Sequence, residues 1–191
     1  MGAIVMISIR SFCVAALLGL AATPARADDI TDAMDQARKS YQSGDLTNAK
    51  QSLDLASQLI GQKNAESFAT LLPKPLPGWK ADKAETATVA LGMGSEASRT
   101  YTNAKGDTVD VKIMGDSAVV MQIATVLNNP QIAGAMGKLV RVGNQRGIQD
   151  RDGGVKMVVN NKFLISVEGS ADAASKLAYA QAIDVAKLSK L

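Results

Sequence analysis

The sequence predicts an α+β fold, in which a helical hairpin precedes a mainly antiparallel, curved sheet with two packed helices. Three observations carry this prediction. Apolar residues recur at helical spacing as far as residue 68. The segment Pro73–Gly78 then interrupts any regular element, because proline fixes φ and lacks the N–H donor. From residue 79 onward apolar and polar residues alternate as in strands, with two helical stretches between them.

Residues 1–27 have the pattern of a secretory signal peptide. Arg10 precedes an apolar run from residue 11 to residue 22, and Ala25-Arg26-Ala27 forms a small-x-small cleavage site. The run is shorter than the roughly 20 residues that span a bilayer. We therefore expect cleavage before Asp28 and a periplasmic or secreted protein, with no integral membrane segment after signal cleavage.

Loss of this segment lowers the net charge from +3 to +1, because Arg10 and Arg26 leave while all 18 acidic residues remain. A chain so close to neutral lacks the basic footprint of nucleic-acid-binding proteins, so we expect no nucleic acid partner. The single cysteine, Cys13, is also lost, and the chain has no histidine. Triads that need imidazole, and zinc sites built on His and Cys, are thereby excluded, and we expect no cofactor.

The hairpin is predicted over residues 28–72, with Ser43-Gly44-Asp45 as the stop, turn and N-cap between its helices. The second helix is expected to continue through Phe68. A short loop makes the helices antiparallel neighbours, and their apolar stripes favour docking on the C-terminal domain. The first stripe comprises Ile30, Ala33, Met34, Ala37 and Tyr41, and the second comprises Leu46, Ala49, Leu53, Ala56 and Ile60.

The connector Pro73–Gly78 leads into the α+β domain, predicted over residues 79–191. Trp79 is expected to pack the connector onto the core. Helices are predicted from Ala118 to about Asn128 and from Ala171 to about Leu188, with a looser stretch before Lys138. Strands are predicted over residues 86–91, 98–103, 107–114, 138–142, 147–150, 155–159 and 163–167.

Three resemblances follow from these segments. The spacing Ala37-x3-Tyr41-x2-Gly44-Asp45-x3-Ala49-x3-Leu53-x2-Ala56 resembles one tetratricopeptide-like hairpin, which implies a partner surface but no peptide-binding solenoid. The element order resembles the Mog1/PsbP-like folds. The layout as a whole resembles an uncharacterised family of secreted proteobacterial proteins, in which a helical hairpin, a segment like Leu72–Trp79 and an α+β domain follow one another. That resemblance implies export and layout, and supplies no site residues.

Residues that could carry chemistry are few. Asp150-Arg151-Asp152-Gly153-Gly154 is the one calcium candidate, but it is typical of a hairpin turn. Ser170 with Lys176, and Ser95 with Lys105, lack the helical spacing of a Ser-Lys pair. Methionines could bind copper, but most are expected to fill the core, and Met93 between two glycines is the one expected to reach the surface. No catalytic and no metal residues are assigned.

We therefore expect an exported, non-catalytic binding or accessory protein that holds a small-molecule ligand or a protein partner in the envelope. One alternative is a metal (copper or calcium) or envelope-stress accessory protein, and another is a carboxylate or Ser-Lys hydrolase. The basic residues of this region, Lys138, Arg141, Arg146 and Arg151, could in part share one face of a hairpin and bind an acidic group. The predicted partner surface comprises Trp79, Met93, Asn129, Gly134, Met136, Arg141 and Arg146.

Overall fold

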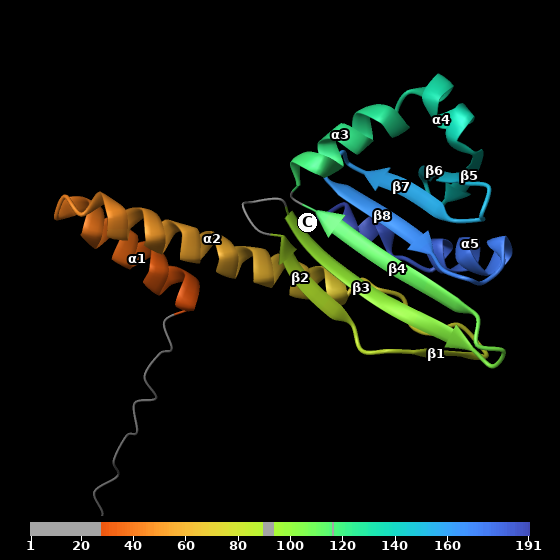
Figure 1. Ribbon diagram of the computed structural model, residues 1–191, viewed down its shortest axis with the longest axis horizontal. Coiled ribbons are helices and arrows are strands. Elements are labelled where there is room, and N and C mark those ends of the chain that lie inside the picture. Colours follow the sequence, from red (N-terminus) through yellow and green to blue (C-terminus); the bar gives the residue numbers. More distant parts are fainter. Residues whose placement is uncertain (1–27, 90–93, 116) are drawn as a thin grey trace, which may run out of the picture.

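The computed structural model describes residues 28–89, 94–115 and 117–191 (Figure 1). It confirms the α+β class, with an open, antiparallel sheet and a pair of N-terminal helices. Its helices are α1 (Asp29–Gln42), α2 (Leu46–Ala69), α3 (Ala118–Leu127), α4 (Pro130–Met136), α5 (Ala173–Gln181) and α6 (Val185–Leu188). Its strands are β1 (Trp79–Ala81), β2 (Glu85–Val89), β3 (Gly94–Asn103), β4 (Thr108–Gly115), β5 (Lys138–Val142), β6 (Gln145–Gln149), β7 (Val155–Val159) and β8 (Phe163–Glu168).

The sheet has the order β1-β3-β4-β8-β7-β6-β5, and β2 also pairs with β3. β1 pairs with residues 101–103 of β3 and β2 pairs with residues 94–98, so two short strands share one edge. β5 forms the other edge. Each pairing between the described strands is antiparallel. Antiparallel strands that are consecutive in the chain, such as β5 and β6, can be joined by a tight hairpin.

One face of the sheet carries the main core. The end of α2, together with α5 and α6, covers this face. Gly115 lies where α2 meets the sheet, and a Cβ there would approach Phe68 to 2.7 Å and Phe163 to 2.8 Å. Glycine therefore permits the edge-to-face contact of these rings, whose centroids are 5.6 Å apart. The buried strand residues are Ala97, Tyr101, Val109, Val111, Ile113, Val155, Met157, Val159, Phe163, Ile165 and Val167.

Two tyrosines fasten the proline connector to this core. The Tyr101 hydroxyl donates to the carbonyl of Pro73 at 2.5 Å, and the Tyr179 hydroxyl accepts from the N–H of Leu76 at 3.2 Å. Burial raises the pKa of Tyr101 to about 12. Trp79 packs edge-on against Tyr179 with ring centroids 5.3 Å apart. The connector is thus packed onto the core, as predicted for Trp79.

The helical arm, which we define as α1 with residues 46–60 of α2, projects from the sheet (Figure 1). Side chains of Asp28 and Asp45 accept hydrogen bonds from the first turns of α1 and α2, and Gly44 takes φ +81° between them. The end of α2 packs on β2 and β3, whereas α1 packs along α2. Docking on the domain therefore involves α2 and leaves α1 outside it.

Several elements differ from the sequence prediction. The looser stretch contains α4, because Asn129 caps its N-terminus and Pro130 occupies the first turn. The final helix divides into α5 and α6, because the Asp184 side chain caps a new start by accepting from the N–H of Lys187. β1 is a strand that alternation did not indicate, since three residues show no period. β3 begins at Gly94, four residues earlier than predicted.

Candidate functional site

The second face of the sheet is partly covered by the helical cap, which we define as α3 and α4. Packing joins α3 to β7 and β8, and α4 to β5 and β6. From Ser117 to Gly137 the sequence has no charged residue. Val120, Ala124 and Ala133 are buried beneath the cap. Large apolar side chains remain exposed on it and on the adjoining β5: Met121, Val126, Ile132, Met136 and Leu139.

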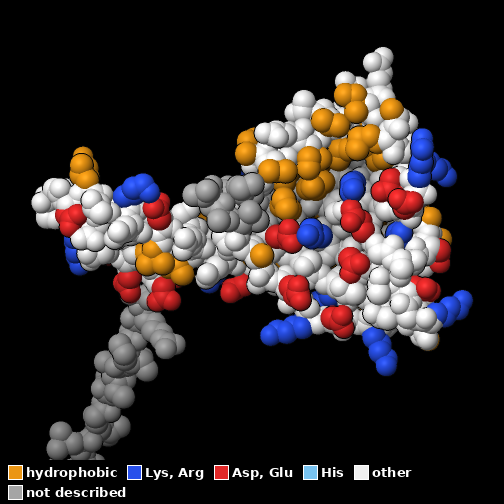
Figure 2. Space-filling model, viewed as in Figure 1, with side chains coloured by type: hydrophobic (Ala, Val, Ile, Leu, Met, Phe, Trp, Pro, Cys, Tyr) orange, Lys and Arg blue, Asp and Glu red, His pale blue; other side chains and the backbone are white. Residues whose placement is uncertain are grey.

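Figure 2 shows that this face has two chemically different parts. Apolar side chains gather over the cap, whereas charged side chains gather over β3, β4 and β8. In the charged part Lys112 pairs with Glu96 at 3.0 Å, and Thr100 donates to Asp110 at 2.6 Å. Side chains in the charged part therefore bind one another, whereas large apolar side chains of the cap are exposed to solvent.

The hairpin of β5 and β6 adds two arginines beside the cap. Gly143, at φ +55°, leads a two-residue turn that pairs Val142 with Gln145. The same register places Arg141 directly opposite Arg146. Because side chains that are direct partners in an antiparallel pair lie on one face, both guanidinium groups emerge on the cap side.

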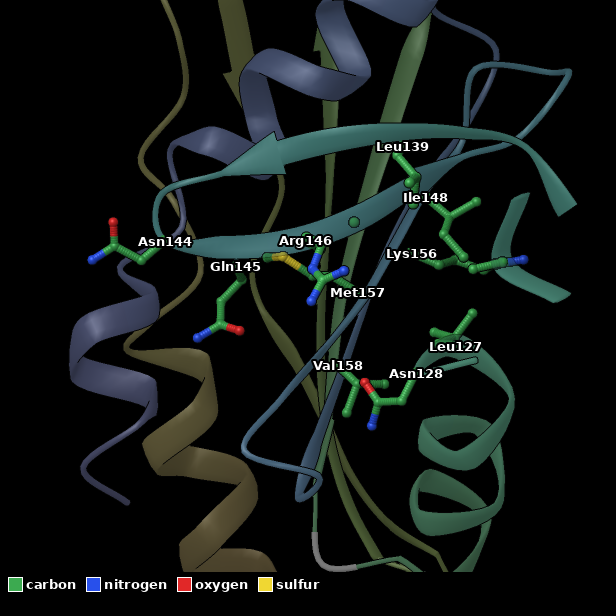
Figure 3. A pocket seen from close by; sticks show the side chains of 12 residues that line it. Leu127, Asn128, Leu139, Asn144, Gln145, Arg146, Ile148, Lys156, Met157 and Val158 are labelled. Carbon is green, nitrogen blue, oxygen red and sulfur yellow. The ribbon is translucent and has the colours of Figure 1, made fainter. Parts of the chain in front are cut away.

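A cavity of about 280 Å³ lies between the cap and strands β5, β6 and β7. Figure 3 shows Leu127 and Asn128 facing it from α3, and Arg146, Ile148 and Val158 facing it from the strands. The apolar side chains that form its walls are those of Leu127, Ala133, Leu139, Ile148 and Val158. Polar side chains at the same cavity are those of Asn128, Asn144, Gln145, Arg146 and Lys156.

Register explains why these side chains meet. Ile148 pairs with Leu139 on one side and with Lys156 on the other, so the three form a row across β5, β6 and β7. Gly137, which precedes β5, lies so close to the end of β6 that a Cβ there would clash with the Gln149 carbonyl oxygen. Glycine at this position therefore lets the chain pass from α4 directly into β5, beside the end of β6.

The two cations that line the cavity differ in their partners. Lys156 pairs with Glu168 at 3.1 Å, and hydrogen bonds from Lys156 and from Ser166 hold the pKa of Glu168 below its usual range. Within the described ranges, the Arg146 guanidinium has neither an ion pair nor a hydrogen bond, and the same holds for Arg141. Of the described cations that line or adjoin the cavity on this face, Arg141 and Arg146 therefore keep their full capacity to bind an anion, whereas Lys156 does not.

Five of the seven predicted partner-surface residues lie on or beside the cap. Arg141 and Arg146 are exposed on the hairpin, while Asn129, Gly134 and Met136 belong to α4 or its N-cap. Trp79 does not join them, because it is half-buried on the core face against Tyr179. Met93, with its flanking glycine turn, lies outside the described residues. Sequence reasoning missed the cavity walls at Leu127, Leu139, Ile148 and Val158.

One signal could have located this region from the sequence. Between Asp116 and Asp150 there is no acidic residue, whereas Lys138, Arg141 and Arg146 lie in that stretch. Together with the uncharged cap, this makes residues 117–149 a continuous segment that is apolar and basic.

The other sites considered from the sequence have structural explanations. The Asp150 carboxylate accepts from the N–H groups of Asp152 and Gly154, which makes residues 150–154 a side-chain-stabilised turn. Buried Lys176 donates to the Asp152 carbonyl at 2.7 Å and so fastens this turn to α5. Across the described ranges, no group of three or more His, Cys, Asp or Glu could hold a metal ion.

The serines and methionines are arranged differently from the alternatives that invoked them. Ser170 hydrogen-bonds with Thr108, not with Lys176. Ser95 lies at the start of β3, whereas Lys105 lies in the turn that follows the other end of this strand. Two methionines expected in the core, Met34 and Met121, are exposed instead, because their helices turn these faces to solvent. Met136, predicted as part of the partner surface, is also exposed.

Within the described residues, none of the helices combines the length and apolar character needed to cross a bilayer. Comparison with known proteins finds no match among protein-family models, curated proteins or solved structures. The resemblance to a family of secreted proteins therefore stays a prediction, and the function is argued from the geometry of the cap and its cavity.

Proposed function

We propose that this chain is an exported, non-catalytic binding protein that holds a small, partly apolar ligand between the helical cap and strands β5–β7. The observation that carries the proposal is the cavity of about 280 Å³, with apolar walls and a few polar side chains. Ligand sites in proteins combine these two features, and their volumes are about 300–1,000 Å³, so this cavity suits a small ligand. Export rests on the signal-peptide pattern of residues 1–27.

The chemistry of the lining supports binding over hydrolysis. Among the described residues that line the cavity, none has a carboxylate, hydroxyl or thiol side chain. A hydrolytic site needs a nucleophile or an acid–base pair within reach of the substrate. The one lining amine, Lys156, is held in an ion pair with Glu168.

The proposal is tested by filling the cavity. Residues 28–191 contain each described helix and strand, so this form is used for the measurement. The neutral dye N-phenyl-1-naphthylamine, whose emission rises in apolar surroundings, is expected to bind it. Val158→Phe places a ring in the cavity and should raise the Kd at least about tenfold, which corresponds to about 1.4 kcal/mol.

Thr102→Phe is the matched control, because Thr102 lies on the same face of the sheet in β3, away from the cavity. It should leave the Kd unchanged, and both variants should keep the circular dichroism spectrum. Ligand binding to the native state should also raise the thermal midpoint of the unsubstituted chain. Absence of dye binding, or equal binding by Val158→Phe, would refute the proposed site.

A further inference from the structure

The β5–β6 hairpin holds an unfavourable charge arrangement. Arg141 and Arg146 are direct cross-strand partners, so their Cβ atoms lie about 4.5–5.5 Å apart on one face. Like charges in this position repel and weaken the hairpin. The repulsion is imposed by the turn at Gly143, because that turn sets the register. An anion between the two guanidinium groups would convert the repulsion into attraction.

No side chain in the described part of the chain supplies that anion. Neither arginine has a carboxylate within ion-pairing distance, and no acidic residue occurs from residue 117 to residue 149. Glu168 is already paired with Lys156. Each guanidinium therefore keeps its planar set of N–H donors, which matches the oxygens of a carboxylate or a phosphate.

The same arginines adjoin apolar surface. Arg146 lines the cavity, and Ile148, two residues further along β6, forms one of its walls on the same face (Figure 3). Leu139 stands two residues before Arg141 on β5 and forms another wall. A ligand that contacts both arginines and enters the cavity must therefore carry negative charge at one end and an apolar body at the other.

From this juxtaposition we infer that the ligand is a small anionic amphiphile. Arg141 and Arg146 hold its carboxylate or phosphate group, and its apolar body lies between Leu127, Leu139, Ile148 and Val158. The inference rests on the proposed function and names the ligand class of that same cavity. It commits to a free, monomeric amphiphile, because the cavity is closed on one side by the cap and on the other by the strands.

The test compares ligands that share an apolar chain and differ in the head group. Decanoate, decyl phosphate and neutral decanol, each below micelle formation, are titrated into residues 28–191 loaded with the neutral dye. The two anions should displace the dye with affinities at least about tenfold higher than decanol, because charge-assisted hydrogen bonds add to the apolar contact. Added salt should reduce this preference.

Arginine variants test the head-group site itself. Arg146→Gln and Arg141→Gln should each reduce the preference for decanoate over decanol about tenfold, and Arg146→Lys should restore part of it, because lysine keeps the charge without the planar fork. Arg151→Gln is the matched control, since Arg151 is exposed in the β6–β7 turn and does not line the cavity. It should leave the preference unchanged.

Each remaining outcome has a separate meaning. Equal affinity for decanol and decanoate, unaffected by the arginine variants, would overturn the anionic ligand and leave the proposed binding function standing. A chain that binds neither the dye nor any amphiphile would refute the proposed function itself. Sedimentation with phosphatidylglycerol vesicles, without binding of monomeric amphiphiles, would overturn the inference and assign the arginines to a bilayer surface.

Discussion

The helical arm and the helical cap expose similar sets of large apolar side chains but differ in what surrounds them. In the arm the interface between helices buries small residues, Ala33, Ala37, Ala49 and Ala56. Ion pairs stand on the arm surface, with Arg38 bound to Asp35 and Lys50 bound to Asp54. The cap has no charged residue, encloses a cavity and adjoins two unpaired arginines.

This difference shows that exposed apolar area alone does not locate a binding site. The arm also exposes large apolar side chains, as the cap does: Met34, Tyr41, Leu46, Leu53 and Ile60. Most protein surface is apolar, and single exposed residues are ordinary. The cap differs because its apolar surface adjoins both a cavity and the arginine pair of the β5–β6 hairpin. One ligand could fill the cavity and neutralise these arginines.

The largest expected effect on stability distinguishes the buried end of α2 from its exposed end in the arm. Phe68→Ala removes a buried ring at the junction with Phe163 and should lower the free energy of unfolding by about 3–5 kcal/mol. Leu53→Ala, in the exposed part of the same helix, should change it by less than about 0.5 kcal/mol. Urea unfolding followed by circular dichroism measures both. Equal effects would mean that the arm is buried as well.

A pH scan separates the core face of the sheet from the cap face. The folded pKa of Tyr101 is raised to about 12, above its unfolded value, so its stabilising contribution is present below pH 10. Stability should therefore fall between pH 10 and pH 12, by up to about 2.5 kcal/mol. Tyr101→Phe should reduce this dependence in urea titrations at each pH, and Tyr179, whose pKa burial also raises, should supply part of what remains. An unchanged slope would contradict the raised pKa.

A third comparison tests the close approach of the arm helices. Ala37→Leu inserts a larger side chain between α1 and α2 and should destabilise the arm by about 1–3 kcal/mol. Ala135→Leu, exposed on α4, is the matched change in the cap and should be close to neutral. Hydrogen exchange of α1 amides reports the loss, and unchanged protection in Ala37→Leu would show that the arm is loosely packed.

The smallest effect concerns the arginine pair. Without ligand, Arg146→Thr removes the repulsion with Arg141 and introduces a residue favoured in strands, so stability should rise by about 0.2–0.5 kcal/mol. Arg151→Thr, outside the pair, should not produce the same rise. Calorimetric unfolding at low salt gives the comparison. A loss of stability in Arg146→Thr would show that Arg146 already has a stabilising partner.

Local patterns predicted much of the fold. Alternation located β4, β7 and β8, since one face of each strand is buried in the core. The N-cap Asp45 marked the start of α2, and the helix predicted from Ala118 begins where Ser117 caps α3. The predicted strand 147–150 matches the end of β6 but not its start at Gln145, because that start depends on the two-residue turn at Gly143-Asn144. With that turn, the opposition of Arg141 and Arg146 follows from counting residues.

The candidate site was less accessible to sequence reasoning. Arg141, Arg146 and the α4 residues were named as a partner surface, but Trp79 was grouped with them although it packs on the opposite face. The cavity walls come from the cap and from three strands, and no local spacing connects Leu127 with Val158. Only the packing of α3 and α4 across β5–β8 brings them together.

The sequence by itself therefore determined most of the helices and strands, where Asp, Ser and Gly end or begin them, and the charge of each segment. These properties depend on interactions between residues a few positions apart. The tertiary structure decided which apolar stripes are buried, which face Trp79 joins, and that an uncharged cap meets an arginine pair beside a cavity. Burial and charge pairing depend on elements far apart in the chain, and a helix stripe has the same sequence pattern whether a partner covers it or not.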